Sequence, residues 1–152
     1  MENLKVTVEL PVDEEGYSLL QCQYCGEFFK VTPSDAEDDG ILNIYCPCCG
    51  LSSETYVTED VLSLGEVKIK NKVELAIYEE FKKLERKTKN SLISFSAGKA
   101  PKPEYEEPLY SKLDATEIVR FDCCNRKAKI KPLLKITGCY CPFCGVKEYE
   151  LK

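Results

Sequence analysis

The chain contains no histidine among its 152 residues. This absence excludes Ser-His and Cys-His nucleophilic pairs, acid–base catalysis by imidazole, and every zinc site with a histidine ligand. Carboxylates are abundant, but no pair of them stands out from ordinary surface charge, and no glycine-rich phosphate-binding loop occurs. We therefore predict a protein that is not an enzyme.

Long apolar runs are also missing. No segment approaches the roughly 20 apolar residues that a membrane-spanning helix requires. Residues 1–16 lack the basic segment and apolar run of a secretory signal. We therefore expect a cytoplasmic protein with no membrane contact. Cytoplasmic thiols stay reduced, so cysteines at C-x-x-C spacing are expected to bind metal rather than to form disulfides.

Cysteine, in contrast, is abundant, and its ten residues fall in two clusters. The first cluster has two C-x-x-C pairs separated by 20 residues, which provide Cys22, Cys25, Cys46 and Cys49. Zinc takes four soft ligands in a tetrahedron, and two such turns present four thiolates together. Gly26 and Gly50 follow the second cysteine of each pair, where the chain must turn sharply. This pattern predicts a structural zinc site, with the side chain of Cys48 pointing away from the metal.

The second cluster is a degenerate copy of the first. Residues 140–146, YCPFCGV, repeat residues 45–51, YCPCCGL, and Cys124 aligns with Cys25. Phe121 then occupies the place of Cys22, so one ligand is missing. We predict that Cys123 supplies it, with Cys139 as the alternative, in a second zinc site made of Cys123, Cys124, Cys141 and Cys144. A second unit with reduced thiols and no metal is the other interpretation.

These turns resemble the zinc-ribbon superfamily, which includes the ribbon of general transcription factor IIB and small bacterial or phage ribbon proteins. The resemblance covers residues 17–58 well and residues 118–150 loosely. It implies a three-stranded antiparallel ribbon with zinc at one end. The first site is also similar to rubredoxin, which would imply iron and electron transfer. Ribbons serve as nucleic-acid binders, protein docking modules or structural clips, so the resemblance implies the fold rather than the function.

The segment between the two clusters predicts a helix. One apolar stripe at helical spacing comprises Val73, Ala76, Ile77, Phe81 and Leu84. Asn71 and Glu74 have the spacing of a capping box. We expect a helix over about 71–89, beginning as early as Thr58, with Gly65 as a weak point. Its stripe is expected to pack against a ribbon, and a homodimer through the helix is the alternative.

We therefore predict a small α+β fold, in which an amphipathic helix and a proline-containing linker join two antiparallel zinc ribbons. The expected segments are an acidic N-terminal ribbon at 1–58, a helical insert at 59–90, a linker at 91–115 and a basic, degenerate ribbon at 116–152. The ribbons are expected to be separate metal modules. Strands are expected at 5–10, on both sides of the first cysteine turn within 17–31, before the second cysteine turn at 41–45, and at 54–58.

The two cysteine-rich ends differ in charge. Residues 1–58 hold 2 basic and 11 acidic residues, whereas residues 116–152 hold 8 basic and 4 acidic ones. Identical partners for both ends are therefore not expected. In the basic end, alternation places Lys127, Lys129 and Lys131 on one strand face beside Arg126. Rows of cations with aromatic neighbours are typical of nucleic-acid binding, and a solvated strand face is the plain alternative.

The function we predict is that of a zinc-binding adaptor, a protein-interaction module of a larger assembly. Nucleic-acid binding through Arg126, Lys127, Lys129 and Lys131 is the alternative, and rubredoxin-like electron transfer is less favoured. Two zinc ions per chain are expected, with iron as the alternative at the first site. The acidic residues 35–39 are expected either to repel nucleic acid or to cover the basic face.

Overall fold

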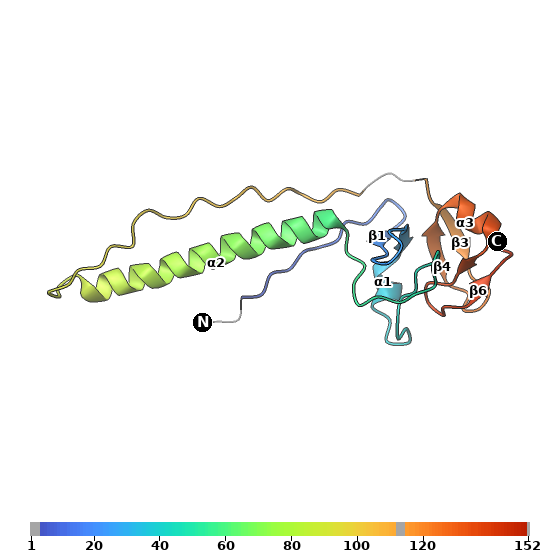
Figure 1. The fold of residues 1–152 in the computed structure, drawn as a ribbon, viewed down its shortest axis with the longest axis horizontal. Helices are drawn as coiled ribbons and strands as arrows, with labels where there is room; N and C mark the ends of the chain where they lie inside the picture. Colours follow the sequence, from blue (N-terminus) through green and yellow to red (C-terminus); the bar gives the residue numbers. More distant parts are fainter. Residues whose placement is uncertain (1–3, 112–114, 152) are drawn as a thin grey trace. The chain divides into compact units, whose positions relative to one another are not determined.

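The computed structural model describes residues 4–111 and 115–151 (Figure 1). It divides into a helical unit, residues 1–9 and 60–108, and a cysteine-rich unit, residues 10–59 and 109–152. Both cysteine clusters therefore lie in one compact unit, where the sequence predicted two separate modules. The segment boundaries at 58, 90 and 115 stay predictions, and residues 112–114 of the expected linker lie outside the described residues.

A four-stranded antiparallel sheet organises the cysteine-rich unit, in the order β1-β2-β4-β3. Its strands are β1 (Ser18–Gln21), β2 (Phe28–Val31), β3 (Glu117–Arg120) and β4 (Lys127–Ile130). One hairpin consists of β1 and β2, and the other consists of β3 and β4. The hairpins meet where Lys30 of β2 lies opposite Lys129 of β4. A smaller antiparallel sheet pairs β5 (Cys139–Tyr140) with β6 (Lys147–Glu148).

The predicted α+β class with antiparallel strands is confirmed, but three predicted strands are wrong. Residues 41–45 contribute only an isolated bridge, between Tyr45 and Ser52. Residues 5–10 form no strand, because the carbonyls of Lys5 and Thr7 accept hydrogen bonds from lysines of the long helix rather than from a neighbouring strand. Residues 54–58 form no strand either. They contribute one ladder-like bond, from the amide of Gln21 to the carbonyl of Tyr56 at 2.9 Å. Each segment lacks the run of backbone partners that a strand requires.

The two halves of the cysteine-rich unit repeat one another. Each hairpin is followed by a short helix that begins with a proline: α1 (Pro33–Ala36) follows β2, and α3 (Pro132–Thr137) follows β4. The strand order reads the same from either edge, which is the order that a two-fold axis between β2 and β4 produces. The sequence repeat is therefore present in the fold as an approximate two-fold relationship, with Lys30 and Lys129 as equivalent residues.

One hydrophobic core serves both halves. It includes Phe29 and Val31 from β2 and Val119, Phe121 and Ile130 from the second hairpin. Phe121, which aligns with Cys22, is fully buried in this core. Burial of a side chain of this kind contributes about 1.5–3 kcal/mol. The second half therefore has a core residue at the position where the first half has a candidate metal ligand.

The helical unit is built around α2 (Glu59–Thr88), which begins at the early limit expected from the sequence and continues through Gly65. The predicted capping box is wrong, because Asn71 lies inside this helix. The carboxamide of Asn71 accepts a hydrogen bond from the amide of Glu104 at 2.8 Å and donates one to its carbonyl at 2.9 Å. Asn71 thus fixes the segment that returns along α2. Among the described helices, none has the length and apolarity needed to cross a bilayer.

Candidate metal centres

Four tight turns carry the metal-binding candidates, and each closes with the same pair of backbone hydrogen bonds. In the first turn, the amide of Cys22 donates to the carbonyl of Glu27 at 2.9 Å, and the amide of Gly26 donates to the carbonyl of Cys22 at 3.0 Å. The turns that begin at Cys46, Phe121 and Cys141 repeat this pattern. The repeat detected in the sequence is therefore a repeat of backbone geometry, including the turn that has lost its first cysteine.

The first thiol group consists of Cys22, Cys25, Cys46 and Cys49, whose Sγ atoms all lie within 4.8 Å of one another. The Sγ atoms of Cys22 and Cys49 are 3.7 Å apart, and those of Cys25 and Cys46 are 3.5 Å apart. Four sulfurs at 2.3 Å from one zinc ion stand about 3.8 Å from each other in a tetrahedron. The donor set therefore fits a tetrahedral ion such as zinc, and iron fits equally well on geometry.

The second thiol group consists of Cys123, Cys124, Cys141 and Cys144, again with every Sγ within 4.8 Å of the others. The Sγ atoms of Cys124 and Cys141 are 3.6 Å apart. The adjacent residues Cys123 and Cys124 share this site because the chain bends immediately after them. Asn125 has a φ of 59°, in the left-handed region, and the equivalent residue of the first half, Gly26, has a φ of 74°. An asparagine tolerates this conformation better than most residues.

Two cysteines lie outside both groups. Cys139 is buried in the shared core with 1% of its surface exposed, and burial raises the pKa of its thiol to about 12. Cys48 is exposed and outside the first thiol group, as the sequence predicted for the residue between two ligands. The geometry therefore favours Cys123 over Cys139 as the fourth donor of the second group.

Backbone amides and burial act in opposite directions on the thiols. The amides of Tyr24 and Cys48 lie 3.4 Å from the Sγ atoms of Cys22 and Cys46. Burial raises the pKa of Cys22, but hydrogen bonds from backbone amides outweigh it, so the pKa of this thiol is lowered. Burial dominates at Cys141 and raises its pKa to about 12. Because a metal takes thiolates, loading these groups must release protons.

The second turns of the two halves, which begin at Cys46 and Cys141, hold each other through reciprocal contacts. The amide of Tyr45 donates to the carbonyl of Pro142 at 2.8 Å, and the amide of Tyr140 donates to the carbonyl of Pro47 at 2.9 Å. The ring of each tyrosine also covers the glycine of the opposite turn, Gly50 or Gly145. Sequence reasoning found the repeated tyrosines but missed this contact, which the shared Tyr-Cys-Pro pattern could have indicated.

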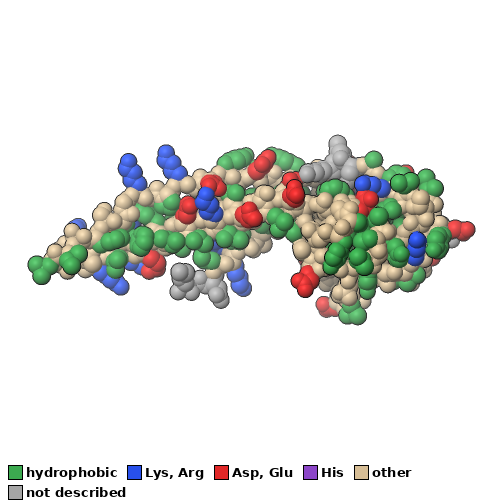
Figure 2. Space-filling model, viewed as in Figure 1, with side chains coloured by type: hydrophobic (Ala, Val, Ile, Leu, Met, Phe, Trp, Pro, Cys, Tyr) green, Lys and Arg blue, Asp and Glu red, His purple; other side chains and the backbone are tan. Residues whose placement is uncertain are grey.

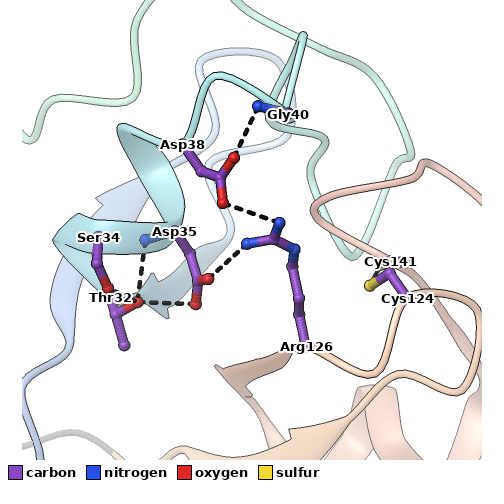
Figure 3. A network of polar contacts seen from close by, with 8 residues as sticks. All are labelled: Thr32, Ser34, Asp35, Asp38, Gly40, Cys124, Arg126 and Cys141. Atoms are coloured by element: carbon purple, nitrogen blue, oxygen red, sulfur yellow. Dashed lines mark hydrogen bonds and ion pairs between the residues drawn. The ribbon is translucent and has the colours of Figure 1, made fainter.

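Arg126, a candidate for phosphate binding, is held by the acidic half of the same unit. Its guanidinium donates to Asp35 at 2.7 Å and to Asp38 at 3.0 Å (Figure 3). Both hydrogen bonds raise the pKa of Arg126. The pKa of Asp38 is lowered, first by a hydrogen bond from the amide of Gly40 and then by the one from Arg126. The expectation that residues 35–39 cover the basic face is met at Arg126.

The expected face of Lys127, Lys129 and Lys131 is exposed at Lys127 and Lys131 but not at Lys129, and Lys131 lies outside the strand. Lys127 is exposed, but Lys129 is buried, and its amino group lies 2.6 Å from Asp13. Lys131 is not in β4. It precedes α3, and its amino group lies 2.5 Å from Glu27. The alternation of lysines along the sequence did not predict their exposure, because both faces of β4 are covered. Successive residues of such a strand do not alternate between buried and solvated positions.

No protein-family model, curated protein or solved structure matches this chain. The resemblance to zinc ribbons therefore depends on the cysteine turns themselves. Within the described residues, those turns assemble two four-cysteine groups, each able to hold a metal ion.

Proposed function

We propose that this chain is a non-enzymatic zinc-binding protein that acts as an adaptor in a larger assembly. The observation that carries the proposal is the pair of four-thiol groups in one folded unit. Four thiolates complete the tetrahedron of a zinc ion and leave no position for water or substrate, which is the pattern of structural rather than catalytic zinc. In this role the metal ions stabilise the sheet and its turns.

The surfaces of the two halves support an adaptor that holds different partners. On α3, Leu133 is 67% exposed and Ile136 is 79% exposed. At the equivalent places after β2 the chain has Ser34 and Glu37. One backbone therefore presents an apolar surface on one half and a polar, acidic surface on the other. Exposed apolar patches mark protein contacts.

The ion pairs of the basic residues favour this adaptor over the nucleic-acid alternative. Arg126, Lys129 and Lys131 each have a carboxylate partner in the first half. A phosphate backbone would have to displace those carboxylates before it gained the usual release of counterions. The basic residues therefore join the two halves of the unit in this proposal.

Native mass spectrometry of protein purified without added metal tests the metal assignment. We expect a colourless chain with two zinc ions. Cobalt substitution is a second test, because a saturated tetrathiolate site has a visible spectrum that added azide or cyanide does not change. A red, redox-active protein would instead support iron and electron transfer, and a spectrum that shifts with azide would indicate an open, catalytic position.

The adaptor role has its own test. A double substitution, Leu133→Asp with Ile136→Asp, should abolish co-purification of a partner from cells without changing the zinc content. The matched control is Ser34→Asp, at the equivalent position of the acidic half, which should leave that partner bound. If both variants retained it, α3 would not be the docking surface.

A further inference from the structure

One face of α2 reads the same in both directions. Steps of four, three and four residues on each side of Val73 give the series Leu62, Glu66, Ile69, Val73, Ile77, Glu80 and Leu84. At 3.6 residues per turn, these positions fall within an arc of about 80°. The order of side chains is therefore palindromic as well as the spacing, with Val73 at the centre.

This palindromic face is largely exposed in the part of the helical unit that the structure describes, with Val73 at its centre half-buried. Its four leucine and isoleucine side chains are between 45% and 53% exposed. Other sides of α2 have neighbours within the unit, since Leu64 is buried and Asn71 is bonded to Glu104. Hydrophobic side chains are visible along this unit in Figure 2. An exposed face of this length, with five of its seven side chains apolar, calls for a partner.

A palindromic face is complementary to itself. When a second α2 is laid antiparallel with Val73 opposite Val73, Leu62 faces Leu84 of the second copy and Ile69 faces Ile77 of the second copy. Every contact then occurs twice, as an isologous interface requires. The apolar contact would extend over about 33 Å of helix.

The charges at the ends of α2 select the antiparallel direction. The helix begins with Glu59 and Asp60 and ends with the basic pair Arg86 and Lys87. In the antiparallel register, Glu59 and Lys87 of the second copy lie opposite each other, each about 40° from the centre of the face, whereas Asp60 and Arg86 lie about 140° from it and contribute only to the charge of each end. A parallel pair would instead place like charges together at both ends, which is unfavourable.

Two glutamates interrupt the apolar series and fix its register. Glu66 lies at the level of Glu80 of the second copy, an unfavourable pair of like charges that Lys83, which is 2.7 Å from Glu80 and within one turn of both, partly offsets. A polar residue inside an apolar seam reduces stability but penalises other alignments. Any sliding of the helices would place these glutamates against isoleucine or leucine.

We infer that this protein forms an antiparallel homodimer through the palindromic face of α2, with the two Val73 side chains on the dyad. The occupant of the face is thus a second copy of the chain. This interface lies outside the cysteine-rich unit, so it does not depend on the proposed metal. A dimer would present two cysteine-rich units to the partners of the adaptor.

Sedimentation equilibrium and native mass spectrometry on the full chain test the interface. We expect a dimer for the wild type and a rise in dissociation constant of at least about tenfold for Val73→Lys, since that substitution places two charges at the dyad. Leu75→Lys is the matched control, because Leu75 is 50% exposed on the same helix but away from the palindromic face. Circular dichroism would establish that both variants keep α2.

Charge reversal tests the direction. Neither Arg86→Glu with Lys87→Glu nor Glu59→Lys with Asp60→Lys should dimerise well alone, because like charges then meet at both ends. A single chain that carries all four substitutions should dimerise again, since its two ends then have opposite charge and only the antiparallel arrangement brings opposite charges together.

A wild-type chain that stays monomeric up to about 100 μM would overturn the inference. Even a modest binding free energy of about −8 kcal/mol gives a dissociation constant of about 1 μM, so a dimer of that strength would be detected well below this concentration. Equal weakening by Leu75→Lys, or no recovery of dimerisation in the chain with all four end charges reversed, would also overturn it. Zinc counts from the same spectra separate this outcome from a failure of the metal proposal.

Discussion

Lys30 and Lys129 face each other where β2 pairs with β4, and both amino groups reach the carboxylate of Asp13, at 3.2 and 2.6 Å. Only 4% and 10% of the two lysine side chains is exposed. Burial raises the pKa of Asp13, but hydrogen bonds from Lys129, the amide of Tyr17 and Lys30 outweigh it and hold that pKa well below its usual range. The two-fold arrangement brings two equivalent cations together, where they share the carboxylate of Asp13, and Glu15 adds a second carboxylate 3.1 Å from the amino group of Lys129.

Removal of this carboxylate should destabilise the cysteine-rich unit. Asp13→Ala leaves two buried amino groups short of their shared partner, and breaking a buried ion pair in this way costs about 3–5 kcal/mol. Urea denaturation of the metal-loaded protein measures the change. The exposed neighbour Glu14 provides the control, since Glu14→Ala should change the free energy of unfolding by less than about 0.5 kcal/mol. Equal effects of the two substitutions would contradict a central role for Asp13.

Glycine substitutions should separate backbone strain from the contact between the two turns. Gly26 and Gly50 have nearly equal φ values, 74° and 73°, so Ala at either position has a similar backbone cost of about 1–2 kcal/mol. A Cβ at Gly26 meets nothing within 4 Å, whereas one at Gly50 would lie 2.8 Å from the ring of Tyr140. We therefore expect Gly50→Ala to lower the melting temperature more than Gly26→Ala. In a Tyr140→Ala background the difference should vanish.

Metal counts should identify the fourth donor of the second group. Cys123→Ser should lose one of the two metal ions, because its Sγ belongs to the group. Cys139→Ser should keep both ions but lower stability, since the hydroxyl would be buried in an apolar core. Inductively coupled plasma mass spectrometry gives the counts, and Cys48→Ser controls for thiol loss. The reverse pattern would assign the ligand role to Cys139.

Loss of the first site should reach the second half. A structural zinc site contributes about 10–16 kcal/mol, comparable with the whole stability of a domain. Because β2 pairs with β4 and both hairpins share one core, Cys25→Ser should lower hydrogen-exchange protection in β3 and β4 as well as in β1 and β2. From the sequence alone, with separate modules, only residues 17–58 would unfold. A loss of protection confined to the first hairpin would instead favour the separate modules expected from the sequence.

Nucleic-acid binding should be weak. With Arg126, Lys129 and Lys131 paired to carboxylates, we expect no saturable change in the anisotropy of short labelled DNA or RNA at about 50 mM salt. A variant with Asp35→Asn and Asp38→Asn frees Arg126 and is the informative comparison. Saturable binding by the wild type, with a salt slope near −2 that Lys127→Ala reduces, would restore the nucleic-acid alternative.

The features predictable from the sequence were those encoded within a few residues. The cysteine turns and the two hairpins follow from local spacing, and so does the helical period of the segment that became α2. The pairing of Lys30 with Lys129 joins residues far apart in the chain, and no local period reports it. The burial of Lys129 was missed for the same reason, because its partner Asp13 belongs to the other half.

The approximate two-fold sheet has a consequence for how this unit can change over evolution. In two identical subunits, every substitution appears on both sides of the axis, so one side cannot become acidic while the other becomes basic. Two halves joined in one chain are free of that restriction. Asp35 and Asp38 can then hold Arg126 with no mirrored pair, and a ligand cysteine can give way to Phe121 in one half while Cys22 persists in the other. Covalent linkage thus turns a symmetric scaffold into one whose two sides are inherited and altered independently.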